Sequence, residues 1–186
     1  MKLKKSASVI QHIDMGIFMK YSSLLARAML SFCAVHLSYA QAASVDTPAP
    51  FKKENIYGVW SKNIFADASI VQGAYKTIYI AGMAAEDSIT GKIAHLGDFS
   101  AQCKMSYDKI RKVLQAQGGD MGDIVNMTSY VTDARNIKTY LECQKESLGT
   151  APLPPNTFVN ISQLSWPGMM VEVQVTAVIP LKNTDQ

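Results

Sequence analysis

The spacing of apolar residues changes along the chain, and this change constrains the fold more than any other feature of the sequence. Apolar side chains recur every three or four positions between Asp98 and Gln117, which predicts a helix that two glycines end. A second helix is expected from Asp133 to Leu148, with Gly149 as its stop. Strand-like segments are expected at residues 56–61, 68–72, 77–81, 124–131, 156–161 and 169–178. This order of elements predicts an α+β fold with both helices on one face of a sheet.

Alternation within the expected strands assigns side chains to the two faces of that sheet. In the last strand Val171 and Val173 point one way and Glu172 points the other. The aliphatic face should pack on the helices, because burial of each such side chain contributes about 1.5–3 kcal/mol. By the same parity, the helix-facing set includes Val125, Met127, Val131, Val159 and Ile161, and the second face holds Tyr79, Tyr130, Asn156 and Phe158. That second face is either hydrated or, as we favour for its aromatic area, covered by another copy of the chain.

The first 42 residues carry the parts of an export signal. Lys20 and Arg27 precede an apolar stretch at residues 28–35, and Ala40-Gln41-Ala42 has the small-x-small pattern of a cleavage site. The apolar stretch is shorter than the roughly 20 residues that cross a bilayer. We therefore expect a cleavable signal peptide at 1–42, a disordered lead-in at 43–54 and one domain at 55–186. The body should be exported to the periplasm or secreted, with no membrane contact after cleavage.

The charge of the body argues against nucleic acid as a partner. The chain has 18 Lys and Arg against 15 Asp and Glu, but five of the basic residues and one acidic residue precede residue 43. The remaining 13 basic and 14 acidic residues leave a body with a charge of −1. Such a body displaces few phosphate counterions. His95 is the one histidine after the leader, too few for a zinc site built from Cys and His, so we expect no metal.

Two cysteines follow the leader, one in each expected helix. Cys103 lies on the apolar face of the first helix, and Cys143 lies within the second. Export would permit a disulfide, but two cysteines in a chain of this size do not require one. We expect free, buried thiols, and a bridge between the helices stays open as the alternative.

Several short motifs follow one another in a characteristic order. They are Lys76-Thr77-Ile78-Tyr79-Ile80-Ala81-Gly82, Thr90-Gly91-Lys92, the glycine-rich run 118–125, Tyr130-Val131-Thr132-Asp133, Pro155-Asn156-Thr157-Phe158-Val159 and Val171-Glu172-Val173. In this order and spacing the chain, from about Phe65 to Pro180, resembles the RidA family, also called YjgF. The resemblance implies a mixed six-stranded sheet of chorismate-mutase-like fold with two helices on one face. It also implies a homotrimer that binds a small molecule in clefts between its subunits.

The resemblance also implies a chemistry. Deaminase members of the family hydrolyse imines and enamines without a metal or organic cofactor, using a glutamate that positions water and an arginine that binds the substrate carboxylate. Position by position, the glutamate is Glu172, the arginine is replaced by Asn156, and a tyrosine by Phe65. An arginine makes charge-assisted bonds that an amide cannot, so we expect a substrate that is neutral or cationic where it meets Asn156.

The sequence and the resemblance are compatible with two functions. The first is an exported imine or enamine hydrolase of altered specificity, with Glu172 as acid and base, no cofactor, and substrate-binding residues Asn156, Phe65, Phe158, Ala81 and Gly82. The second is a trimeric module of the same fold that binds a metabolite or a protein without turnover. In the first, partial burial raises the pKa of Glu172. In the second, Glu172 lies on a hydrated face or pairs with a lysine across a subunit interface.

Overall fold

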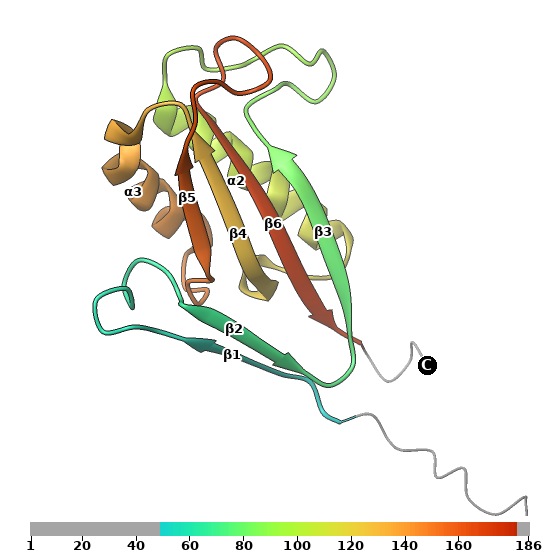
Figure 1. Cartoon of the computed structure of the whole chain (residues 1–186). Helices are drawn as coiled ribbons and strands as arrows, with labels where there is room; N and C mark the ends of the chain where they lie inside the picture. Colours follow the sequence, from blue (N-terminus) through green and yellow to red (C-terminus); the bar gives the residue numbers. More distant parts are fainter. Residues whose placement is uncertain (1–48, 182–186) are drawn as a thin grey trace, which may run out of the picture. The chain divides into compact units, whose positions relative to one another are not determined.

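The computed structural model describes residues 49–181, so the expected signal peptide lies outside the described residues. The strands are β1 (Lys52–Ile56), β2 (Ala68–Gln72), β3 (Tyr75–Met83), β4 (Ile124–Val131), β5 (Asn156–Asn160) and β6 (Val171–Pro180). The helices are α2 (Phe99–Ala116) and α3 (Ile137–Leu148), with short 3-10 turns η1 (Met121–Asp123) and η2 (Ala134–Asn136). Figure 1 shows α2 and α3 on the same side of a sheet, as the α+β expectation requires.

The six strands form two sheets instead of the single sheet that was expected. β1 and β2 pair antiparallel as a hairpin of their own. The other four strands are ordered β3-β6-β4-β5, and β6 is antiparallel to both of its neighbours, whereas β4 and β5 are parallel. The sheet is mixed, as expected, and β6 occupies its interior (Figure 1).

The expected helices and most strands form close to their expected bounds. Asp98 is the N-cap of α2, where its side chain accepts a hydrogen bond from the backbone N–H of Ala101. The second expected helix is divided: Asp133 caps the 3-10 turn η2, and α3 begins only at Ile137 and ends before Gly149. The Arg135 side chain, which bonds Asp133, lowers the pKa of this carboxyl to about 2. Asp133 therefore stays ionised and caps the turn at neutral pH.

The strand expected at residues 56–61 is wrong, and residues 52–54 of the lead-in expected at 43–54 belong to β1, whereas residues 43–48 lie outside the described residues. The strand is Lys52–Ile56, and residues 59–64 form turns beside which Ser61 accepts a hydrogen bond from the N–H of Gly58. Strand β1 lacks an alternating apolar pattern because a polar side chain, and not an apolar one, attaches it to the rest of the fold. Lys53 donates to the backbone carbonyls of Gly122 and Ile124, which ties β1 to the start of β4.

The core lies between the helices and one face of the four-stranded sheet. Val171, Val173 and Val175 of β6 are buried there, as their parity predicted. In β4 an irregularity in the pairing between Ile124 and Asn126 buries Ile124 instead of Val125. We call the opposite side, which carries Tyr79, Tyr130, Glu172 and Gln174, the open face.

The faces of β5 are the reverse of the expected ones. β5 pairs in parallel with β4 so that Phe158 lies opposite Ser129, and Ser129 is fully buried on the helix side. Asn156 and Phe158 therefore face the helices, and Val159 shares the open face with Tyr130. The alternation of side chains in a short strand does not show which of the two sets faces the core, because the register with the neighbouring strand decides this.

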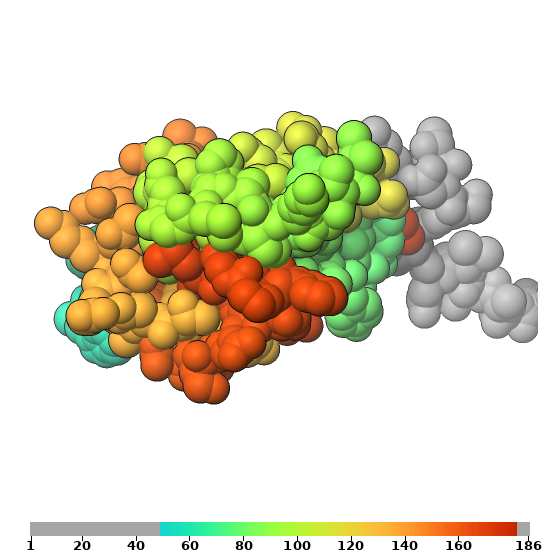
Figure 2. Space-filling model, turned by 90° about the horizontal axis from the view of Figure 1, so that it is seen from above, coloured from blue at the N-terminus to red at the C-terminus, as the bar shows by residue number. Residues whose placement is uncertain are grey.

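A buried amide joins the two loops at one end of the sheet. Gln102 of α2 donates to the carbonyls of Ala94, His95 and Gly168 and accepts from the N–H of Met170. Figure 2 shows the loop after β3 (green) and the loop before β6 (orange-red) side by side on this surface. The end of β3 is thereby held beside the start of β6, where Glu172 lies. Among residues 49–181, no helix combines the length and the apolar character that crossing a bilayer would require.

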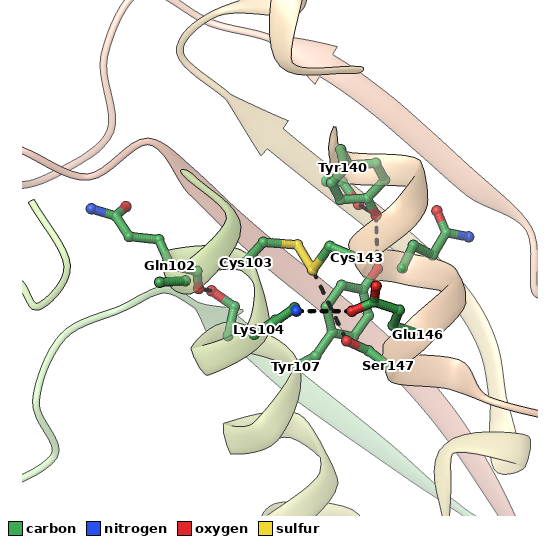
Figure 3. The surroundings of a disulfide bond; sticks show 12 residues. Gln102, Cys103, Lys104, Tyr107, Tyr140, Cys143, Glu146 and Ser147 are labelled. Carbon is green, nitrogen blue, oxygen red and sulfur yellow. Dashed lines mark hydrogen bonds and ion pairs between the residues drawn. A yellow bond between two sulfur atoms is a disulfide. The ribbon is translucent and has the colours of Figure 1, made fainter. Parts of the chain in front are cut away.

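The expectation of free thiols is wrong, because Cys103 and Cys143 form a disulfide between α2 and α3 (Figure 3). The two residues are 40 positions apart, and both are almost fully buried. The exposed ion pair between Lys104 and Glu146 spans the same two helices. Helix periodicity placed each cysteine on an inward face, but only the packing of α2 on α3 brings them together.

Reduction of this disulfide is expected to lower the free energy of unfolding by about 2–4 kcal/mol, because the bridge restricts the unfolded chain. Urea unfolding of the oxidised chain with and without dithiothreitol measures the difference. In a Cys103→Ala/Cys143→Ala control, dithiothreitol should leave the midpoint unchanged. Equal midpoints for the oxidised and reduced wild-type chains would contradict a bridge that contributes to stability.

Candidate functional site

Glu172 lies on the open face of the sheet, in the second position of β6. Its cross-strand partner is Tyr130 of β4, and on the other side its carboxylate lies against Gly82 of β3. A Cβ atom at Gly82 would overlap the Oε1 atom of Glu172. Glycine at this position is thus what lets the glutamate side chain lie flat against β3. The sequence analysis named both residues, and the structure brings them together.

The environment of Glu172 favours its protonated form. Partial burial of the carboxyl raises its pKa, and the negative charge of Glu86 raises it further. No ion pair within residues 49–181 involves Glu172. A carboxyl with a raised pKa and no cationic partner holds its proton to higher pH than an ordinary glutamate, which suits it to donate a proton.

Ala81, which was expected at the site, and Met83 flank this glycine in the sequence. Ala81 is exposed, and Met83 is half-buried and lies opposite Val173 of β6. The pairing of β3 with β6 is irregular between Ile80 and Met83, so the strand leaves its regular path where Glu172 meets it.

Asn156 lies on the helix side of the sheet, in a cluster of buried polar groups. Its amide N–H groups donate to the hydroxyl of Tyr140 at 3.0 Å and to Oε1 of Gln144 at 3.3 Å. Its carbonyl oxygen accepts a hydrogen bond from the hydroxyl of Ser129 at 3.0 Å. Tyr140 also bonds the hydroxyls of Ser129 and, at 2.9 Å, Tyr107.

These contacts settle which hydroxyl donates to which. The one proton of Ser129 goes to Asn156, so Tyr140 must donate to Ser129, and Tyr107 must then donate to Tyr140. Burial raises the pKa of both tyrosines, which keeps the hydroxyls protonated. Every N–H and the carbonyl oxygen of the Asn156 amide are therefore used inside the protein. These internal hydrogen bonds hold the Asn156 amide in place, and its role in substrate binding stays a prediction.

Phe65 and Phe158 lie near Asn156 and not near Glu172. Both line a pocket of about 350 Å³ together with Tyr140, Gln144 and Asn156. The ring of Phe158 packs on Tyr140 with centroids 5.1 Å apart, and Phe65 meets Trp60 edge to face. The expected site is thus divided by the sheet. Gly82, Ala81 and Glu172 lie on one side, and Asn156, Phe65 and Phe158 lie on the other.

The sequence analysis did not identify the other residues of the group around Asn156 or of the group around Glu172. Tyr107, Tyr140 and Gln144 belong to helix faces that are mostly apolar, and only the inward position of such polar groups could have marked them. Glu86 and Lys109 form an ion pair between a loop and α2, and no local pattern signals it. His95 adopts a positive φ of 53° and binds neighbours through its backbone carbonyl. In the described range of 49–181, no group of three or more His, Cys, Asp or Glu could hold a metal ion.

Asn156→Ala is expected to lower the free energy of unfolding by about 1–3 kcal/mol, because it leaves buried Ser129 and Gln144 atoms without a partner. Asn160→Ala, an exposed position on the same strand, is the matched control and should change stability by no more than about 0.5 kcal/mol. Denaturant unfolding measures both. Equal effects of the two substitutions would contradict the structural role of Asn156.

Comparison with known proteins agrees with this fold. A family model described as Endoribonuclease L-PSP matches residues 62–179. The RutC family protein YjgH of Escherichia coli is 33% identical over 84 residues, which cover 45% of this chain and 63% of YjgH, less than two thirds of its length. A RutC family protein of Pyrococcus abyssi is 28% identical over 100 residues, which cover 54% of this chain and 76% of that protein.

Solved structures share the architecture at low sequence identity. The Rid-family protein YyfB of Yersinia pestis superposes with a TM-score of 0.58 at 22% identity, covering 72% of this chain and 99% of that one. RidA of an Antarctic Psychrobacter superposes with a TM-score of 0.51 at 23% identity, covering 63% of this chain and 95% of that one. The family match spans well over half of the sequence, and these structures have the same fold: the chain belongs to the RidA/YjgF family.

Proposed function

We propose that this chain is an exported hydrolase of C=N bonds in which Glu172 acts as acid and base. The observation that carries the proposal is the placement of Glu172. Its carboxyl lies against Gly82 on the open face, has no ion-pair partner among the described residues and has a raised pKa. A glutamate on a fully hydrated sheet face would not have its pKa raised by burial.

The chemistry needs one proton to move between Glu172, water and the substrate. Protonated Glu172 donates to the imine nitrogen, and the resulting carboxylate takes a proton from water as the water oxygen bonds to carbon. Glu172 then protonates the nitrogen of this tetrahedral intermediate, the C–N bond breaks, and ammonia leaves. The proton of the new carbonyl oxygen returns to Glu172, so that one imine and one water become one carbonyl compound and one ammonia.

The charges around Glu172 favour an imine without a carboxylate. The group whose charge acts on Glu172 is Glu86, another acid, and Asn156 does not reach this face. A substrate carboxylate would meet repulsion with no arginine to offset it. We therefore propose a substrate that is neutral or cationic near the reacting bond.

A second copy of the chain completes the site in this proposal. Tyr79 of the open face is 82% exposed, and Tyr130 beside Glu172 is half-buried. Covering this face would shelter Glu172 from bulk water and remove aromatic surface from solvent. A homotrimer, which the family resemblance implies, would do both.

Export remains part of the proposal and is supported by chemistry in the body. The leader sequence suggested it, and the buried disulfide between Cys103 and Cys143 suits an oxidising compartment. A thiol pair with this spacing would stay reduced in most cytoplasms.

The alternative is a module that binds a small molecule without turnover. It is favoured by the pocket beside Phe65 and Phe158, which the sheet separates from Glu172. Ribonuclease activity, which the family description names, is disfavoured by the charge of −1 after the leader.

Glu172→Gln is expected to reduce ammonia release from an imine about 10²–10⁴-fold, because the amide keeps the shape but cannot titrate. Wild-type chain should prefer an imine without an α-carboxylate over its carboxylated analogue. Glu142→Gln, an exposed position on α3, is the matched control and should retain the wild-type rate. Undiminished hydrolysis by Glu172→Gln would remove the catalytic role, and no hydrolysis by wild type would favour the binding module.

Gly82→Ala is expected to reduce the same rate at least about tenfold by pushing the Glu172 carboxyl away from β3. The overlap falls on the end of a flexible side chain, so the thermal midpoint should change little. In a Glu172→Gln background the substitution should cause no further loss of rate, since both changes act on one group. An additive loss would mean that Gly82 acts independently of Glu172.

A further inference from the structure

Two loops lead to the two residues that meet at the candidate acid. The β3 loop, residues 84–98, follows Gly82 within two residues, and the β6 loop, residues 161–170, runs directly into β6. Glu172 is the second residue of that strand, so the path of the β6 loop places its carboxyl against Gly82. The two loops lie side by side (Figure 2).

Strand pairing is irregular where Gly82 meets Glu172. The register between β3 and β6 shifts between Ile80 and Met83, where two residues of β3 stand opposite one residue of β6. On its other side β6 keeps a regular ladder with β4 at this end, and Tyr130 pairs there with Glu172. Strand pairing alone thus holds Glu172 more firmly against β4 than against Gly82.

Gln102 of α2 supplies a connection at this irregular end. The side chain is fully buried. Its Nε2 atom donates to the carbonyls of Ala94 at 3.3 Å, His95 at 3.2 Å and Gly168 at 2.9 Å, and its Oε1 atom accepts from the N–H of Met170 at 2.9 Å. One amide therefore bonds both loops, and its bond to the β6 loop ends two residues before the candidate acid.

Side-chain packing joins the two loops at the same place. Gly168 has a positive φ of 89°, and a Cβ atom there would lie 2.5 Å from Cδ2 of Leu96, so Leu96 of the β3 loop lies directly against Gly168. A small buried apolar cluster also contains residues of both loops, and Tyr130 packs against it. Its buried members are Ala84, Leu164 and Met169.

The β3 loop is held on α2 at a second place, but the β6 loop is not. Lys109 donates at 3.1 Å to the carbonyls of Ala84 and Glu86 in the β3 loop. Among the hydrogen bonds of residues 49–181, those of Gln102 alone link the β6 loop to α2. Loss of the Gln102 amide should therefore release the β6 loop, while the β3 loop stays attached through Lys109.

We propose that Gln102 is a positioning residue that keeps Glu172 against Gly82 by joining the β3 loop to the β6 loop. The inference rests on the proposed function, because this placement matters for hydrolysis only if Glu172 carries the reaction. Gln102 acts through Glu172 and does not touch the substrate. The net stabilisation from a buried hydrogen bond is small but its geometry is specific, so the main contribution of this amide is a fixed separation between the loops.

The first test replaces Gln102 by a residue of similar length without a donor or an acceptor, in Gln102→Met. NMR of the full chain with labelled glutamate carboxyls follows Glu172, whose signal is identified by its absence in Glu172→Gln. We expect the Glu172 signal to move in Gln102→Met. The amide of Met170 should exchange its hydrogen at least about tenfold faster, because its acceptor is gone.

Ser106→Ala is the matched control on the same helix. Ser106 is also fully buried, and its hydroxyl donates to the backbone carbonyl of Gln102 within α2, so the substitution removes a buried hydrogen bond without changing either loop. The Glu172 signal and the exchange of the Met170 amide should stay as in the wild type.

Gly168→Ala disturbs the same junction from the surface and leaves the core of α2 intact. The new Cβ atom would displace Leu96, and the positive φ disfavours any residue but glycine. We expect this variant to move the Glu172 signal as well. Gly118→Ala is its control, since Gly118 has a positive φ of 77° and open space around it, so that it carries the backbone strain alone.

Hydrolysis of an imine without a carboxylate gives a second measurement. Gln102→Met should lower kcat about tenfold or more and leave KM within about twofold of the wild-type value, because the acid is displaced and substrate binding is retained. Ser106→Ala should keep both constants. A merely structural role of Gln102 would lower the folded fraction of the chain and leave kcat per folded chain unchanged.

An unmoved Glu172 signal in a folded Gln102→Met chain would overturn the proposal, and so would an equal movement in Ser106→Ala. If Gln102→Met does not fold, the Glu172 signal of Gly168→Ala decides by the same criterion against Gly118→Ala. The NMR and exchange measurements need no substrate, so they are separate from the proposed hydrolysis. A moved Glu172 signal together with a wild-type chain that hydrolyses no imine would keep the placement of Glu172 by Gln102 and reject the hydrolysis.

Discussion

Burial of one face of β6 under the helices is the constraint on which the site depends. Val171, Val173 and Val175 are fully or almost fully buried there, and a strand that turns three valines inward must turn Glu172 outward. β6 is also an interior strand, so the backbone around Glu172 is held on both sides by β3 and β4. The apolar core and the candidate acid are two consequences of the same alternation, and a shift of one residue in register would exchange them.

The helix side of the sheet shows how the chain departs from the pattern that its family resemblance implies. Where an arginine was expected, Asn156 closes a ring of hydrogen bonds with Tyr140 and Ser129 beneath α3. The ring contains no charge, so it can be buried without the desolvation cost of a guanidinium. Asn156 thus lies as a hydrogen-bonded, uncharged amide in the wall of a pocket that Phe65 and Phe158 also line.

The open face, unlike the uncharged helix side, carries carboxylates whose charge is only partly balanced by cations. Glu172 has no cation of its own within residues 49–181, and the nearby Lys109 is held by Glu86 and two backbone carbonyls. The loops that carry these groups are joined to α2 by Gln102 and to each other through Gly168 and Leu96. These contacts hold the two loops side by side (Figure 2), and with them the end of β3 beside the start of β6, where Glu172 lies.

The sequence by itself determined the features that a local period encodes. These are α2 with its Asp98 cap, the strands β2 and β4, the inward valines of β6 and the outward Glu172. Tertiary structure alone decided the face of Asn156, the polar strand β1, the Cys103–Cys143 bridge and the Glu86–Lys109 pair. The physical reason is the distance in sequence over which each feature is set. The period of side chains along a helix or strand depends on residues that are neighbours in the chain. Strand register, disulfide pairing and buried ion pairs join distant residues, which only the packing of whole elements brings into contact.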